Sequence, residues 1–210
     1  MYQSSSDHQP LEVREVARGF TYGSYVRLED THRYELLRGV LFMVPAPTPS
    51  HQEVVARLVE AIRAHVKQGN LGVALPAPVD VVLSDEDVVQ PDVVFVSQAR
   101  IAIVTQACIH GSPDLVVEVL SPATARYDRE AKRQIYSAYG IRECWLVDPD
   151  AGTVEVLVLT EGCGESQTLS GGGATLVTDG VYGTGKAIIS RVLPDLSIGI
   201  DALFENLIPA

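Results

Sequence analysis

Cysteine is scarce in this sequence, which holds only Cys108, Cys144 and Cys163 among its 210 residues. An odd number of cysteines without CxxC spacing argues against a disulfide scaffold and a zinc knuckle, and fits a reducing cytoplasm. The first ten residues are polar and lack both the basic start and the apolar run of a signal peptide. No apolar stretch approaches the length of about 18 residues that a membrane span needs. We therefore expect a cytoplasmic protein without a membrane segment, in which residues 1–10 form a disordered tail.

Basic residues are also in short supply. Lysine and arginine number 16 against 27 aspartate and glutamate residues, which gives a formal net charge of −11. An acidic chain repels phosphate backbones at long range, so general electrostatic binding of nucleic acid is disfavoured. Binding of nucleic acid would need a local basic patch or a metal ion that neutralises carboxylates. The same acidic balance is equally typical of a metal-binding enzyme or of a plain soluble protein.

Length and composition indicate an ordinary globular chain. Apolar residues make up 46% of the sequence and charged residues 20%, which excludes a disordered chain. A chain of this length can bury roughly 70% of its unfolded surface and needs no disulfide or structural metal to fold. Because about 150 residues per domain is the usual scale, we predict a single domain over residues 11–210.

The hydrophobic pattern predicts the order helix, three strands, helix, strands. The expected elements are two short strands in 33–44, a helix over 51–67, strands in 72–84, 91–97 and 113–121, a helix over 125–139, and strands over 143–148 and 153–159. Ser50 is the expected N-cap of the first helix, with Glu53 completing a capping box. The runs 91–97 and 113–121 are apolar on both faces, which suits interior strands. This order indicates an α/β or α+β sandwich.

The most informative residues are acids inside these apolar runs. Glu118 stands in the run LVVEVL, Asp114 lies four residues earlier on the same strand face, and Asp92 opens another apolar strand. Burying a lone carboxylate costs several kcal/mol unless it is paired, protonated or bound to metal. Carboxylates on adjacent strands are the oxygen ligands that Mg²⁺ takes. Asp80, in PVDVVL, is a further acid of this kind, although a structural or surface role is favoured for it.

Simpler interpretations stay open for these acids as well. Asp92 and Asp114 both follow proline, so either can be a strand-start residue that faces solvent or caps a turn. Glu118 can also be a half-exposed strand residue.

The second helix adds a cation to this picture. At 100° per residue one side of the helix carries Asp128, Lys132, Ile135, Tyr136 and Tyr139, and the other side carries Arg126, Arg129 and Arg133. Lys132 therefore shares the apolar side, which is unusual for lysine, and can reach over the sheet towards Glu118. The alternative is an i,i+4 pair with Asp128 on the helix flank. The arginines form either a local basic patch or a solvated face.

Carboxylates, a lysine and one divalent cation make a coherent chemistry. The metal lowers the pKa of a bound water and screens charge on a phosphate. The lysine orients that water or helps to deprotonate it, and it stabilises the transition state. This set of residue types favours metal-assisted hydrolysis of a phosphodiester.

Five segments of the chain occur together, in the same order, in one known family. They are RYELLRG (33–39), PSHQEVVARL (49–58), VVQPDVVFV (88–96), SPDLVVEVLSPATARYDREAKRQIYSAYGIRECWLVDP (112–149) and LPDLSIGIDALF (193–204). Together they resemble the bacterial Uma-two (Uma2) family of restriction-endonuclease-like proteins, a branch of the PD-(D/E)XK nuclease superfamily. The resemblance implies a restriction-endonuclease-like mixed β-sheet flanked by helices.

The resemblance also implies roles for particular residues. Asp92 resembles the acid of the PD motif, and Glu118 resembles the acid of the (D/E)XK half-motif. Leu120 stands where that half-motif has its lysine. The lysine of this family has moved to the following helix, which makes Lys132 the candidate.

Two further residues match the family with less specificity. Glu35, in RYELLRG, resembles an additional acid near the site, although a surface strand residue explains it nearly as well. His51 resembles the histidine at the start of the first helix, and it can equally be an ordinary first-turn residue.

We interpret the sequence as a Mg²⁺- or Mn²⁺-dependent endonuclease. The expected catalytic residues are Asp92, Glu118, Lys132 and Glu35, with Asp92 and Glu118 as metal ligands. The expected partner is nucleic acid, DNA in the first place, and a homodimer is compatible with the sequence. Two alternatives stay open: a non-catalytic binding or regulatory protein on a nuclease fold, which the acidic charge favours, and a hydrolase of small phosphate esters.

Overall fold

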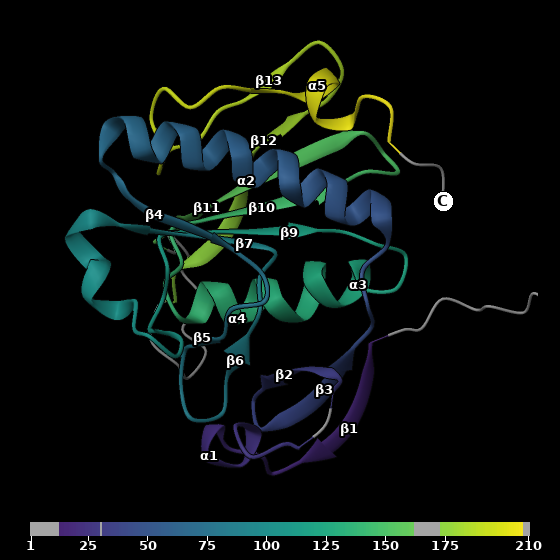
Figure 1. Ribbon diagram of the computed structural model, residues 1–210, viewed down its shortest axis with the longest axis vertical. Coiled ribbons are helices and arrows are strands. Elements are labelled where there is room, and N and C mark those ends of the chain that lie inside the picture. The colour runs from purple at the N-terminus through teal and green to yellow at the C-terminus, as the bar shows by residue number, and fades with distance from the viewer. Residues whose placement is uncertain (1–12, 30, 162–172, 208–210) are drawn as a thin grey trace, which may run out of the picture.

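The computed structural model describes residues 13–29, 31–161 and 173–207, so the predicted tail over residues 1–10 lies outside the described residues. Two six-stranded sheets and the helices packed on them form the framework of the molecule (Figure 1). The fold is a mixed α+β arrangement, as the pattern of the sequence and the family resemblance predicted.

The central sheet has the strand order β12-β11-β10-β9-β7-β4. Its strands are β4 (Gly72–Pro76), β7 (Val93–Ser97), β9 (Leu115–Val119), β10 (Glu143–Asp148), β11 (Thr153–Thr160) and β12 (Thr175–Tyr182). Strands β9 and β10 are parallel and the other neighbours are antiparallel, so the sheet is mixed.

The second sheet has the order β1-β3-β2-β6-β5-β8. It consists of β1 (Arg14–Arg18), β2 (Arg33–Leu37), β3 (Val40–Val44), β5 (Val81–Val82), β6 (Val88–Val89) and β8 (Ile109–His110). Strands β2 and β3 are the two predicted strands of 33–44, and they turn at Arg38 and Gly39, which both have positive φ. A two-stranded pair, β13 (Ala187–Ile188) and β14 (Ile198–Gly199), completes the strands of the described chain.

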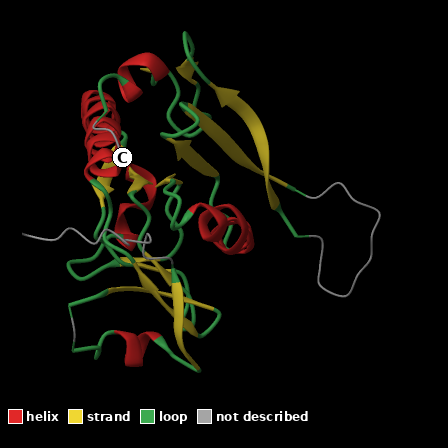
Figure 2. Cartoon of the chain, turned by 90° about the vertical axis from the view of Figure 1, so that its right-hand side faces the viewer, coloured by secondary structure: helices red, strands yellow, loops and turns green. Residues whose placement is uncertain are grey.

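Helices cover both faces of the central sheet (Figures 1 and 2). The helical segments are α1 (Tyr22–Tyr25), α2 (Pro49–Gly69), the 3₁₀ segment η1 (Gln98–Ile103), α3 (Ala125–Tyr127), the π-helical turn η2 (Asp128–Lys132), α4 (Arg133–Ala138) and α5 (Ile200–Phe204). Helix α2 packs on one face through Val54, Leu58 and Ile62. On the other face, Ile135 and Tyr136 of α4 pack between the central sheet and the second sheet.

The alternation of side chains along β9 divides it between these two layers. Val117 and Val119 pack in the cluster under α2, whereas Val116 packs in the cluster under α4. Because successive side chains point to opposite faces, Glu118 points towards α4. This strand was predicted to be interior because it is apolar on both faces, and all five of its residues are buried.

The start of α2 differs from the prediction. The N-cap is Thr48, not Ser50, and the Thr48 side chain accepts a hydrogen bond from the backbone N–H of His51. Pro49 stands at the first helical position, where its missing N–H costs nothing and its fixed φ suits a helix. The helix ends at Gly69, and its C-cap Asn70, in the left-handed conformation, closes the last turn.

The described helices include none that is long and apolar enough to span a bilayer.

Candidate active site

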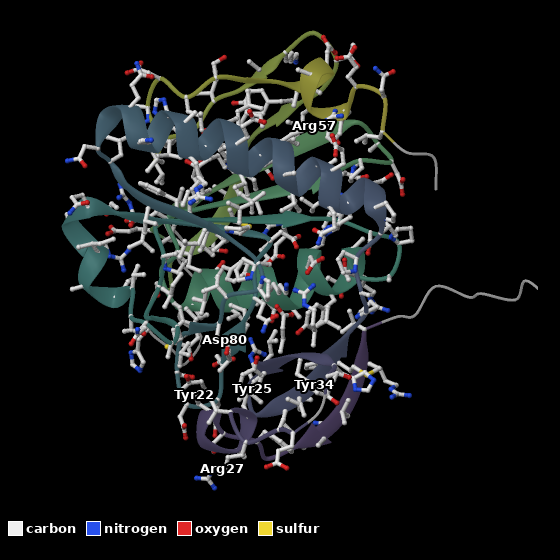
Figure 3. All side chains as sticks on the ribbon, viewed as in Figure 1. Tyr22, Tyr25, Arg27, Tyr34, Arg57 and Asp80 are labelled. Carbon is white, nitrogen blue, oxygen red and sulfur yellow. The ribbon has the colours of Figure 1, made fainter. Side chains whose placement is uncertain are left out.

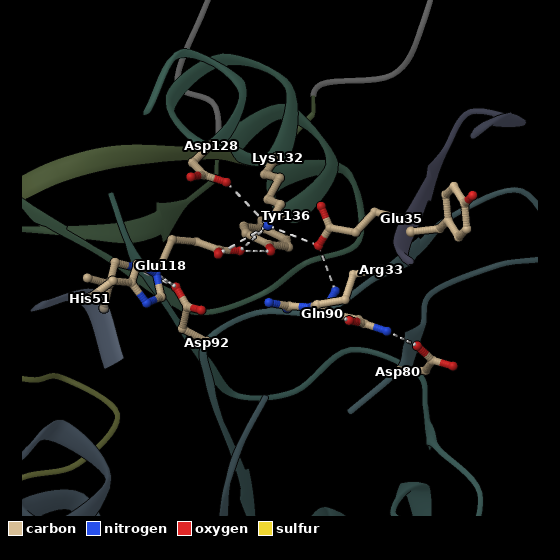
Figure 4. Close-up of polar contacts among 12 residues, drawn as sticks. Arg33, Glu35, His51, Asp80, Gln90, Asp92, Glu118, Asp128, Lys132 and Tyr136 are labelled. Atoms are coloured by element: carbon tan, nitrogen blue, oxygen red, sulfur yellow. Dashed lines mark hydrogen bonds and ion pairs between the residues drawn. The ribbon is translucent and has the colours of Figure 1, made fainter. Parts of the chain in front are cut away.

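A pocket of about 730 Å³ opens between the two sheets and the start of α2. Its walls come from β2, the loop from β3 to α2, the segment before β7, the end of β9 with the loop after it, and the α3–η2 region. Polar and charged residues among those that line it include Arg33, Glu35, His51, Gln90, Asp92, Glu118, Asp128 and Lys132. Figure 4 shows these side chains gathered at one place.

Lys132 lies at the centre of this group. Its Nζ atom is 3.1 Å from both carboxylate oxygens of Glu118, 3.0 Å from Oε1 of Glu35 and 3.2 Å from Oδ1 of Asp128. The lysine side chain is only 6% exposed. Lys132 therefore makes both contacts that the sequence offered as alternatives. It reaches Glu118, and it also forms the i,i+4 pair with Asp128.

The helix that carries Lys132 is irregular at this point. Residues 125–138 form α3, the π turn η2 and α4 in succession, so the predicted single helix contains a widened turn. Both Asp128 and Lys132 lie in that turn and are buried. Single π turns inside α-helices occur frequently at functional sites.

Glu118 is also held from a second direction. The hydroxyl of Tyr136, one turn further along the helix, donates a hydrogen bond to Oε1 of Glu118. Tyr136 is fully buried. Lys132 and Tyr136 together fix the orientation of the Glu118 carboxylate.

Glu35 approaches from the second sheet. Its Oε1 accepts a hydrogen bond of 2.8 Å from the backbone N–H of Gln90 in addition to the contact with Lys132. Its other oxygen, Oε2, is buried without a hydrogen-bond partner among the described residues. Glu35 is thus a buried acid at the site and not a surface strand residue.

Asp92 lies just before β7 and pairs with His51. The distance from Nε2 of His51 to Oδ2 of Asp92 is 3.2 Å, and the same oxygen accepts the backbone N–H of Val119 at 2.8 Å. The register that aligns Val93 with Val117 brings Asp92 next to Glu118 on the neighbouring strand. Asp92 is the more accessible of the two acids, with 12% of its side chain exposed against 3% for Glu118.

Burial and charge set the protonation of this cluster. Desolvation raises the pKa of Glu118 well above its usual value, although Lys132 opposes the shift. Desolvation likewise raises the pKa of Asp128, again opposed by Lys132. For Lys132, burial alone would lower the pKa, but the carboxylates of Glu118, Glu35 and Asp128 outweigh it and raise the pKa well above its usual value. Lys132 therefore stays an ammonium that donates hydrogen bonds.

The structure thus brings together five of the residues that the sequence singled out, Glu35, His51, Asp92, Glu118 and Lys132. Two other candidates lie elsewhere. Asp80 does not line the pocket, and its carboxylate accepts hydrogen bonds from Tyr25 and Gln90. Asp114 is fully buried and accepts the backbone N–H of Ser97.

The opposite side of the second helix forms no free basic patch. Arg126 pairs with Glu130, and Arg129 pairs with Asp148 and Glu155. Arg133 donates to the carbonyl oxygen of Leu176. The interpretation as an ordinary solvated and ion-paired face fits these contacts.

Metal ligands are not gathered in this arrangement. Over the part of the chain that the structure describes, no three His, Cys, Asp or Glu residues converge in a geometry that could hold a metal ion. The Lys132 ammonium lies where the carboxylates converge. The donor set itself fits a hard divalent cation, because four carboxyl groups line one pocket, three of them in contact with the Lys132 ammonium, and Oε2 of Glu35 has no hydrogen-bond partner among the described residues.

Comparison with known proteins identifies a family and a similar solved structure. The profile of a family described as "Uma2: Putative restriction endonuclease" matches residues 22–185. Among solved structures, the fold resembles the crystal structure of "a putative nuclease belonging to DUF820" from Anabaena variabilis ATCC 29413. The two chains are 21% identical with a TM-score of 0.68, over 90% of this chain and 99% of that chain. No curated protein matched the chain.

Proposed function

This chain belongs to the Uma2 family, which is described as "Putative restriction endonuclease". We propose that it is a metal-dependent endonuclease that hydrolyses phosphodiester bonds of nucleic acid, DNA first. The observation that carries the proposal is the position of Lys132. A buried ammonium in contact with Glu118, Glu35 and Asp128 borders the same pocket as Asp92. A lysine beside carboxylates is a residue set that can hold a divalent cation and stabilise the charge that develops in phosphodiester hydrolysis.

Asp92 and Glu118 are the residues that would hold Mg²⁺ or Mn²⁺. When bound, the ion would supply a water of lowered pKa and screen the charge of the phosphate. His51 and the Val119 N–H hold Oδ2 of Asp92 in place, and Tyr136 holds Glu118. These contacts keep both acids aimed at the pocket.

In this proposal Lys132 stabilises the transition state electrostatically. Its raised pKa favours the charged ammonium, which argues against a part for Lys132 in deprotonating the water. It can donate hydrogen bonds to a phosphate oxygen on which negative charge develops, or orient the attacking water. Glu35 and Asp128 hold its ammonium in position for that task.

A hydrolase of small phosphate esters is the second candidate. The depth of the cluster favours it, because the side chains of Glu35 and Asp128 are only 2% and 4% exposed. A small ester reaches such a depth more easily than a backbone held in a duplex.

A nuclease assay tests the proposal. Plasmid DNA, single-stranded and duplex oligonucleotides and a small phosphodiester are incubated with the protein in Mg²⁺ or Mn²⁺ and in chelator. We expect cleavage of nucleic acid only with metal, and a loss of about 100-fold or more in Asp92→Asn and Glu118→Gln. The control is Glu130→Gln, an exposed acid on the same helical segment, which should cleave like the wild type.

Two results would contradict the nuclease. Cleavage of the small ester alone favours the second candidate. Absence of cleavage for every substrate with both metals favours a non-catalytic protein on a nuclease fold.

A further inference from the structure

About half of the lysine and arginine side chains of this molecule form ion pairs with its own acids. All 16 lysine and arginine residues lie in the described ranges. Many of them form ion pairs with described carboxylates, among them Arg18, Arg57, Arg100, Arg126, Arg129, Lys132, Arg142 and Arg191. For a polyanionic substrate, the cations that matter most are those that line the pocket and are not already paired.

The pocket is lined by two of these cations, Arg33 and Lys132. Lys132 already contacts three carboxylates. Arg33 differs, because no carboxylate of the described residues forms an ion pair with its guanidinium. Its described side-chain contact is a hydrogen bond of 3.4 Å from Nε to the amide oxygen of Gln90. Its full positive charge therefore borders the pocket.

The strand places Arg33 beside the cluster. Arg33 and Glu35 are two residues apart on β2, so their side chains lie on the same face. In Figure 4 Arg33 is drawn close to Gln90 and Glu35, with Asp80 on the far side of Gln90 from Asp92 and Glu118.

Gln90 is itself fixed in an orientation that suits this arginine. Its Nε2 donates to Oδ1 of Asp80 at 2.8 Å and to the Tyr25 hydroxyl at 3.3 Å. The Tyr25 hydroxyl in turn donates to Asp80 at 2.9 Å. Because Asp80 accepts from the amide nitrogen, the amide oxygen is left to face Arg33. Asp80 thus acts on Arg33 through Gln90 and does not pair with Arg33 itself.

We propose that Arg33 is the residue of this site that binds a phosphate of the substrate, with its guanidinium on the oxygens of a phosphodiester at the pocket mouth. The inference rests on the proposed function for the identity of the substrate. A guanidinium binds phosphate through two parallel hydrogen bonds, which gives direction as well as charge. Arg33 then positions the strand, and Asp80, Gln90 and Tyr25 position Arg33.

Oligonucleotide binding tests this assignment separately from cleavage. The parent for the test is Asp92→Asn, in which cleavage should be lost and the fold kept. Binding of labelled single-stranded and duplex oligonucleotides is followed by fluorescence anisotropy at low ionic strength with Mg²⁺. Adding Arg33→Gln should weaken binding by about tenfold or more, the loss expected for one charge-assisted hydrogen-bonding contact. Arg33→Lys should fall between the two, because lysine keeps the charge and loses the fork.

A control and a salt titration sharpen the result. Arg27 is an exposed arginine away from the pocket, labelled at the edge of the molecule in Figure 3, and Arg27→Gln should bind like the parent. With Arg33→Gln the slope of log affinity against log salt should fall in magnitude by about 0.7 to 0.9, the release of one phosphate contact.

The two proposals fail in different ways. Binding that is unchanged within twofold by Arg33→Gln, or absent in the parent, overturns the role of Arg33. Binding that depends on Arg33 in a protein that cleaves no nucleic acid overturns the nuclease and keeps the phosphate contact.

Discussion

At the scale of single residues, the contacts of Lys132 lead to the first prediction for the site. Lys132→Met should lower the cleavage rate at saturating substrate by about 100-fold or more, because the transition state loses its nearest cation. Arg129→Met is the matched control, since Arg129 is exposed and pairs with Asp148 and Glu155 on the other side of the helix. Its turnover at saturation should stay near that of the wild type.

The Lys132 variant needs a check of folding. Removal of one partner of a buried ion pair costs about 3–5 kcal/mol, so urea unfolding of Lys132→Met is measured beside its kinetics. If a folded Lys132→Met cleaves as fast as the wild type while Arg129→Met does not, the exposed side of the helix carries the function.

Particular residues also show what the sequence could predict about the site. Asp92 and Glu118 could be found because an acid in an apolar strand needs a partner, and Lys132 because it shares a helix face with Ile135 and Tyr136. Glu35 and His51 rested on the family resemblance. The structure places all of these at one pocket, and their chemical roles stay predictions.

Other site residues gave no usable signal. Tyr136 reads as a core aromatic on an apolar helix face, and its contact with Glu118 depends on the exact height of the helix over the sheet. Gln90 acts on Glu35 through its backbone N–H, which any residue other than proline carries. Arg33 differs from Lys132, the other cation that lines the pocket, because no described carboxylate forms an ion pair with it, and that is a property of the folded chain.

At the scale of elements, long and strongly patterned segments were predicted well. Helix α2 and strands β7, β9, β10 and β11 all lie where the apolar pattern indicated. Strand β1 was missed because four of its five residues are exposed, and β6 and β8 because each has two residues. The predicted strand region 72–84 holds two strands, β4 and β5, which lie in different sheets. The π turn was missed because apolar spacing continues through it with only a local change of phase.

Asp114 leads to a prediction about how two elements are joined. It stands just before β9 and accepts the Ser97 N–H at the end of β7, with Arg100 at 3.2 Å. Burial alone would raise the pKa of Asp114, but the Ser97 N–H and Arg100 outweigh it and lower the pKa below 3.8. The ionised form thus stabilises the fold above the unfolded pKa, and this stabilisation is lost as the pH falls through the folded pKa.

Asp114→Asn should therefore lower the free energy of unfolding by about 1–3 kcal/mol at neutral pH. The difference from the wild type should shrink as the pH falls below 3.8, the ordinary value for this group. Urea unfolding across this pH range measures it, with the exposed Glu130→Gln as control. A difference that stays constant with pH would mean that shape, and not charge, is what Asp114 supplies.

At the scale of the whole molecule, some of the excess acidic residues are concentrated in one pocket. The chain has 27 acidic and 16 basic residues, and one pocket collects Glu35, Asp92, Glu118 and Asp128 around Lys132. The sequence could predict that carboxylates gather, because burial demands compensation. It also predicted that Lys132 reaches Glu118. It could not predict that the same ammonium contacts Glu35 of the second sheet, since this depends on how the helix packs between the two sheets.

This surplus of carboxylates leads to the last prediction, the response of the whole fold to metal. A divalent ion that binds only the native state stabilises it by mass action, by about 2.7 kcal/mol at a concentration of 100 Kd. Millimolar Mg²⁺ or Mn²⁺ should therefore raise the melting temperature of the wild type, and chelator should reverse the shift. Asp92→Asn and Glu118→Gln should lose the metal-dependent part of this shift, which is measured for each variant against its own melting temperature in chelator. Sodium chloride at matched ionic strength controls for screening, and Glu130→Gln should keep the full shift. A wild-type melting curve that does not move with either metal would mean that Lys132, already in contact with three of the four carboxylates, supplies all the positive charge that this pocket takes.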